Sequence, residues 1–208
     1  MKVNLLLLVS SALPFVVSAE PYYLIEGGFG TAFSYEEPIT IERDGQSDID
    51  LGSVSFETKP FDSPPYYMLR LGRWDETDGY EIEFIHHKLY AKGLPDQGVT
   101  DFEVTDGYNL LYFNKSYLIG DYVARAGVGV VISHLDMTID GQNYKDGYQL
   151  AGVSLNLAGE RRFEISESIM AGLEGKVTYS YADIDYSGGS VTVPNLALHL
   201  IASIKYKI

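Results

Sequence analysis

The last fourteen residues of the chain, from Asn195 to Ile208, read N-L-A-L-H-L-I-A-S-I-K-Y-K-I and decide the class of fold. Every second residue, counted back from the terminus, is apolar: Ile208, Tyr206, Ile204, Ala202, Leu200, Leu198 and Leu196. The intervening residues are mostly polar or small: Lys207, Lys205, Ser203, Ile201, His199, Ala197 and Asn195. Alternation with a period of two predicts a β-strand with one apolar and one polar face. The stretch is also longer than the about 9–11 residues with which a tilted strand crosses a bilayer.

This terminal stretch resembles the C-terminal signal strand of bacterial outer-membrane barrels, although those strands usually end in Phe and this one ends in Ile208. At the other end, Lys2 precedes a short apolar run, and Val17-Ser18-Ala19 has the small-residue pattern of a signal-peptide cleavage site. We therefore expect residues 1–19 to be a signal peptide and residues 20–208 to form one barrel domain. No later stretch approaches the roughly 20 apolar residues of a spanning helix, so a membrane location requires a closed barrel.

Composition narrows the possible functions. The chain has no cysteine, which excludes disulfides, a thiol nucleophile and cysteine metal sites. Its formal charge of −14 argues against nucleic-acid binding, which needs clustered Lys and Arg. The 17 tyrosines are typical of a barrel with aromatic girdles at the two membrane surfaces.

Seven further stretches alternate in the same way as the last one. The eight predicted strands are 22–33, 66–74, 80–90, a fourth that includes 108–113, 122–133, 148–158, 163–181 and 195–208. The connections alternate long and short, and the long ones, beginning with the acidic segment 34–65, are predicted to be external. Within that segment, 39–41 and 54–56 are predicted to form a short hairpin above the membrane. The pattern predicts an all-β fold, an eight-stranded antiparallel transmembrane β-barrel.

The polar faces of these strands carry charges of both signs: Glu26, Arg70, Glu81, Glu83, Arg125, Glu174 and Lys176. In a membrane barrel they would face inward as a paired network. In the competing fold, a soluble lipocalin-like carrier barrel, the apolar face would instead line a ligand cavity. The tyrosines, the signal peptide and the terminal strand favour the membrane barrel.

An eight-stranded barrel is just wide enough for side chains to fill, so we expect no open pore. In size and topology the chain resembles the OmpA and OmpX class, and equally the lipid A palmitoyltransferase and deacylase barrels. The resemblance implies a bacterial outer-membrane protein that contacts membrane lipid and lipopolysaccharide and is inserted by the barrel-assembly machinery. We expect a monomer without a cofactor, whose acidic external loops serve envelope integrity or surface interaction.

The alternative function is a lipid-modifying outer-membrane enzyme, an acyl hydrolase or acyltransferase. His86, Asp106 and His134 lie at the predicted external ends of three neighbouring strands, and by parity they continue the outward-facing rows. A histidine oriented by a carboxylate is the minimal general base for ester or amide chemistry, and Lys88 could hold a lipid phosphate. The simpler interpretation is that these are polar residues where strands leave the lipid. Adjacent His86 and His87 point to opposite faces, which argues against a histidine metal site.

Overall fold

The computed structural model describes residues 20–104 and 107–208, so the predicted signal peptide, residues 1–19, lies outside the described residues. The described chain forms fourteen β-strands. They are β1 (Tyr22–Ser34), β2 (Glu37–Arg43), β3 (Ile49–Glu57), β4 (Tyr67–Trp74), β5 (Asp78–His86), β6 (Leu89–Lys92), β7 (Val99–Val104), β8 (Tyr108–Ile119), β9 (Tyr122–Ser133), β10 (Asp136–Ile139), β11 (Gln142–Lys145), β12 (Gln149–Glu164), β13 (Ile169–Tyr186) and β14 (Gly189–Lys207). Among these residues there is no helix of a length and apolarity that could span a membrane.

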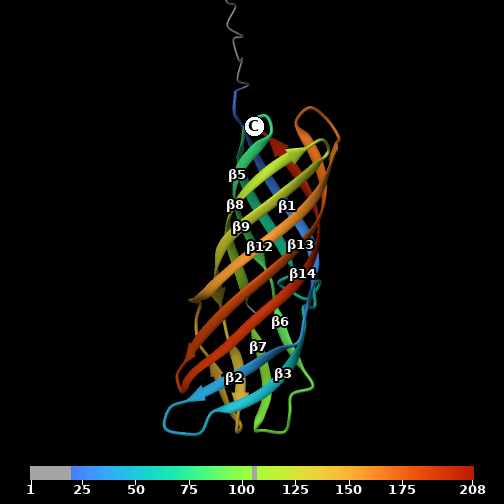
Figure 1. The fold of residues 1–208 in the computed structure, drawn as a ribbon. Coiled ribbons are helices and arrows are strands. Elements are labelled where there is room, and N and C mark those ends of the chain that lie inside the picture. The colour runs from blue at the N-terminus through green and yellow to red at the C-terminus, as the bar shows by residue number, and fades with distance from the viewer. Residues whose placement is uncertain (1–19, 105–106) are drawn as a thin grey trace, which may run out of the picture.

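Eight of the strands form a closed antiparallel barrel. Their order is β1, β4, β5, β8, β9, β12, β13 and β14, and β14 pairs back to β1. The closing ladder runs from Leu24 opposite Lys207 to Ser34 opposite Ala197. The start of β1, the end of β14 and the short turns lie at one end of the barrel, and the longer connections lie at the other (Figure 1). The predicted eight-stranded barrel is confirmed.

Burial alternates along the barrel strands as the sequence predicts. On β13, for example, Leu173 is 51% exposed, whereas the next residue, Glu174, is 1% exposed. The apolar rows therefore face outward, and the charged rows face the interior. An apolar exterior is the arrangement that lipid requires, and it is the reverse of a soluble carrier barrel.

Two segments that fall between the predicted strands are part of strands instead. Gly159–Arg162 lies within β12, and Asn114–Ser116 lies within β8. In both places the inward–outward alternation continues through the polar residues, because the inward positions face a polar interior and need no apolar side chain. The turn after β12 comes at 165–168, where the amides of Ile165 and Ser166 both donate to the carbonyl of Ile169.

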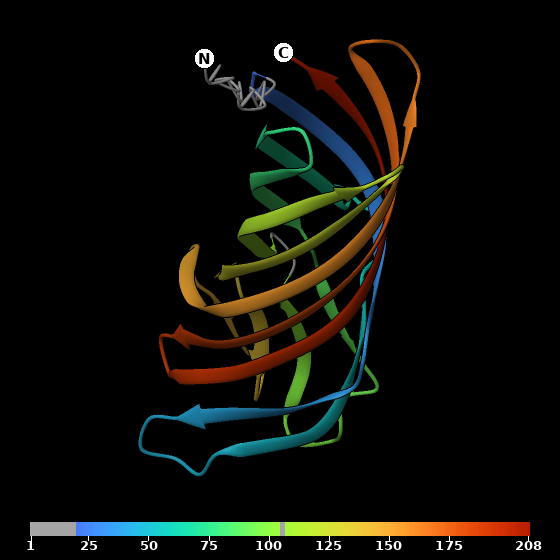
Figure 2. The same ribbon diagram turned by 45° about the horizontal axis from the view of Figure 1, so that its top comes forward.

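The external segments are folded rather than loose. Beyond the barrel, the outer part of β14 pairs with β2, and the sheet continues through β3, β6, β7, β10 and β11 (Figure 2). The predicted hairpin at 39–41 and 54–56 is confirmed as β2 and β3. The connections that follow the predicted strands 80–90 and 122–133 contain strands as well. We call this outer unit, residues 35–66, 87–104, 134–148 and 182–195, the cap.

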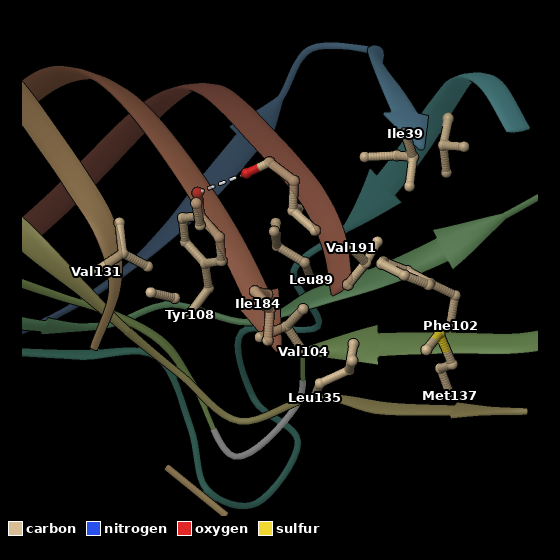
Figure 3. Packing of buried hydrophobic residues seen from close by; sticks show 14 of the residues in the cluster. Ile39, Leu89, Phe102, Val104, Tyr108, Val131, Leu135, Met137, Ile184 and Val191 are labelled. Carbon is tan, nitrogen blue, oxygen red and sulfur yellow. Dashed lines mark hydrogen bonds between the residues drawn. The ribbon is translucent and has the colours of Figure 1, made fainter. Parts of the chain in front are cut away.

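The cap encloses an apolar core of its own. Phe102 and Val104 from β7 meet Leu135, Met137 and side chains from the other cap strands (Figure 3). All four are at most 1% exposed. The protein therefore has a polar interior at membrane level and an apolar interior above it.

Candidate functional site

The barrel interior holds a network of charged side chains. Arg70 contacts Glu26 at 2.8 Å, and Glu83 and Glu174 at 2.9 Å each. Arg125 contacts Glu81 at 2.7 Å and both Glu160 and Glu174 at 2.6 Å. Five carboxylates and five cations face this interior and balance in charge: Glu26, Glu81, Glu83, Glu160 and Glu174 with Arg70, Arg125, Arg162, Lys176 and Lys205. The predicted inward network is thus present, and its side chains occupy the barrel cross-section.

A layer of aromatic and histidine side chains lies between this network and the cap core. The Tyr66 hydroxyl is 2.9 Å from Nδ1 of His199, and the Thr178 hydroxyl is 2.9 Å from its Nε2. The ring of His87 lies 5.3 Å from that of His199, and Tyr108 donates to the Val193 carbonyl at 2.9 Å. The interior is therefore filled at this level too.

Two of the predicted catalytic residues, His86 and His134, lie at the ends of β5 and β9 that face the cap. His86 Nδ1 donates to the Asn109 side-chain carbonyl at 2.7 Å, and its ring stacks on Tyr67 with centroids 5.1 Å apart. His134 packs against Tyr148 at 5.2 Å, and its backbone amide donates to the Gly107 carbonyl, next to the start of β8.

Asp106 lies outside the described residues, and the catalytic role of His86, Asp106 and His134 stays a prediction.

The two outward-row residues His86 and Lys88 are buried, at 4% and 1% exposed. Tyr67 and Asn109 pack against His86, and the segment that precedes β4 lies against Lys88. Lys88 Nζ donates to the Asp62 carbonyl at 3.1 Å, and Lys59 lies over the ring of Tyr90 at 3.8 Å. The alternation along β5 predicts which face of the strand each residue occupies, but it does not predict which other segments pack on that face.

The cap carries most of the net charge. Its segments contain 16 acidic and 5 basic residues, a net of −11 out of the chain's −14. Like charges also face each other within it, because Glu103 on β7 lies directly opposite Asp136 on β10. Partial burial and the neighbouring Asp101 raise the pKa of Glu103. The cap therefore concentrates negative charge at one end of the barrel.

No group of three or more His, Cys, Asp or Glu side chains that could hold a metal ion occurs in residues 20–104 and 107–208.

Comparisons with known proteins show the fold. The solid-state NMR structure of outer membrane protein AlkL in DMPC lipid bilayers matches with a TM-score of 0.53 and 10% identity, over 100% of this chain and 97% of AlkL. The crystal structure of Neisserial surface protein A gives a TM-score of 0.45 and 9% identity, over 92% of this chain and 99% of that one. The crystal structure of Ail, the attachment invasion locus protein of Yersinia pestis, gives a TM-score of 0.41 and 10% identity, over 90% of this chain and 97% of Ail.

No family model matches the chain, and no curated protein matches it in sequence. At 10% identity the likeness to AlkL shows the fold alone. Together with the apolar exterior, it gives this chain the fold of the small bacterial outer-membrane β-barrels, in agreement with the predicted location.

Proposed function

We propose that the protein is a non-conducting outer-membrane barrel whose folded, acidic cap interacts with cationic partners at the cell surface. The observation that carries this proposal is the cap itself. External segments that only connect strands need neither an apolar core nor a shared sheet, and this unit has both. A folded surface with a net charge of −11 attracts cations and steers their approach.

The filled interior supports the non-conducting part of the proposal. Paired charges occupy the barrel at membrane level, and the layer of Tyr66, His87, Tyr108 and His199 lies above them. In planar lipid bilayers we expect no regular conductance steps from the refolded protein. Stable single-channel steps would contradict this part of the proposal.

The binding part is tested with a fluorescent oligolysine peptide as the cationic probe. Asp44→Asn with Asp48→Asn removes two charges from the cap tip, where both side chains border a cavity of about 500 Å³. Asp75→Asn with Glu76→Gln removes two charges from the short turn after β4, at the opposite end. We expect the tip pair to weaken binding of the peptide, and the effect to shrink at high salt because salt screens exposed charges. Equal weakening by both pairs would show that total charge, rather than the cap, binds the peptide.

A lipid-modifying role is the second candidate, and one contact supports it. The 2.7 Å contact between Nδ1 of His86 and the side-chain oxygen of Asn109 holds the imidazole ring in one orientation. A general base has to be positioned in this way relative to the proton that it removes. This role predicts an altered lipid A mass in cells that express the protein, and its loss in His86→Ala and in His134→Ala. Identical lipid A with and without the protein would refute it for that substrate.

A further inference from the structure

The barrel mouth opposite the cap contains a cavity of about 720 Å³. It lies between the turns after β8 and β12 and is bordered by both chain ends, with Leu118, Met170 and Tyr22 on its apolar wall. These three pack against a small buried cluster of Leu24, Trp74 and Val123. With the cap outside the cell, this mouth faces the periplasm. Its volume is within the range of small-ligand sites, about 300–1,000 Å³.

Arg162 lines this cavity and is 8% exposed. Its guanidinium carbon lies 4.2 Å from the centroid of the Trp74 ring, and its Nε is 3.6 Å from Glu160, beyond hydrogen-bond distance. Neither Nε nor Nη2 has a hydrogen-bond acceptor among the described residues. A guanidinium has five N–H donors, and unmade hydrogen bonds of a buried charged group are costly. An acceptor from outside the chain would relieve that cost.

The other charges at the mouth lie nearer the water. Arg161 lies over the Phe163 ring at 5.1 Å, and Lys207 lies over the Tyr22 ring at 4.4 Å. Three acidic residues also border the cavity, and all three are exposed on its turns or strand ends: Asp121, Glu164 and Glu167. The buried cation is therefore deep in the cavity, and charges of both signs surround the entrance.

We propose that Arg162 binds a phosphate group that enters the mouth from the periplasmic side. The planar guanidinium matches phosphate and carboxylate by two parallel hydrogen bonds. Phosphate has more acceptor oxygens, so it can accept from Arg162 and from Lys207 at the entrance together. The group comes from a phospholipid headgroup of the adjacent leaflet or from a soluble phosphate, since both offer the same oxygens. This site is independent of the cap and of its proposed function.

The chain provides its own reporter, because Trp74 is its single tryptophan and lies against Arg162. Inorganic phosphate is titrated into the full-length mature protein in a nonionic detergent, at constant ionic strength in chloride, and Trp74 fluorescence is recorded. We expect a saturable change, a loss of affinity of about 10- to 100-fold in Arg162→Gln, and a smaller loss in Arg162→Lys, which keeps the charge but not the fork. The matched control Arg161→Gln should change affinity by less than about threefold, as expected for an exposed charge.

Folding of each variant is checked by its heat-modifiable gel mobility, and calorimetry of the unmodified protein gives a second measure of binding. Vesicles of phosphatidylglycerol replace free phosphate in a parallel arm, and a response only there identifies the lipid headgroup as the source. The proposal is overturned if neither arm saturates, if Arg161→Gln weakens binding as much as Arg162→Gln, or if acetate binds as tightly as phosphate.

Discussion

Replacing Arg70 by methionine removes the cation that three buried carboxylates share. Its guanidinium lies 2.8 Å from Glu26 and 2.9 Å from both Glu83 and Glu174, and its side chain is 1% exposed. Methionine keeps much of the side-chain length but none of the charge. Removing one partner from a buried ion pair costs about 3–5 kcal/mol, because the other partner stays buried without compensation. We expect Arg70→Met to lower the free energy of unfolding by that amount.

The matched control is Arg73→Met on the same strand. The Arg73 side chain is 46% exposed, and it contacts only Asp75 at 3.4 Å among the ion pairs of the described residues. Exposed pairs contribute at most about 1 kcal/mol. Urea unfolding of the protein from lipid vesicles, followed by Trp74 fluorescence and by gel mobility, measures both variants without the ionic screening that guanidinium would add.

A second variant separates loss of charge balance from loss of packing. Arg70→Met with Glu174→Gln restores equal numbers of inward acids and bases, so it should recover part of the stability lost in Arg70→Met. If Arg70→Met costs no more than Arg73→Met, the network does not stabilise the barrel, and the reasoning from buried pairs is refuted.

Three other substitutions test separate parts of the molecule. Gly127→Ala would place a Cβ 1.9 Å from the Asn114 amide oxygen, so we expect a loss of about 1–3 kcal/mol from overpacking, measured by the same urea assay. Phe102→Ala removes a side chain that is 1% exposed and should cost the cap about 3–5 kcal/mol, seen as faster cleavage of the cap by chymotrypsin while the barrel keeps its gel mobility. Glu103→Gln removes a like charge opposite Asp136 and should raise cap stability at neutral pH by at most about 0.5 kcal/mol after screening. The pKa of Glu103 is raised in the folded cap, so on acidification Glu103 is protonated in the folded state before the unfolded state. The unmodified protein then loses the same repulsion that Glu103→Gln removes. The difference in stability between the two proteins should therefore vanish at low pH.

The sequence predicts the barrel well because a lipid-facing strand obeys one rule along its whole length. Alternation identified all eight strands and placed Glu26, Arg70 and Glu174 correctly in the interior. The same rule could not find strand ends, because a charged inward residue such as Arg162 is indistinguishable in sequence from a turn residue. The pairing of β12 with β13 shows that β12 continues past this point, because Arg162 lies opposite Gly172.

The cap strands were harder to predict because they are short. β10 and β11 have four residues each, too few for alternation to stand out. One local signal was present, since Asp140-Gly141 is a preferred hairpin turn and both residues have positive φ, of 50° and 80°. The burial of Lys88 had no signal in the residues around it, because the segment that covers it, at Asp62, lies before β4 in the sequence.

In both the barrel and the cap, the side chains that the surroundings disfavour are turned inward, but the surroundings differ. Lipid surrounds the barrel, so its charged side chains are buried inside, as they are around Arg70. Water surrounds the cap, so its apolar side chains are buried inside, as they are around Phe102. β13 and β14 run through both halves, so their inward face changes from Glu174 at membrane level to Ile184 in the cap. The barrel ladder thereby fixes the register from which the cap sheet grows. Removing β2 and β3 would expose that apolar face, so variants of the cap surface test its function better than deletions do.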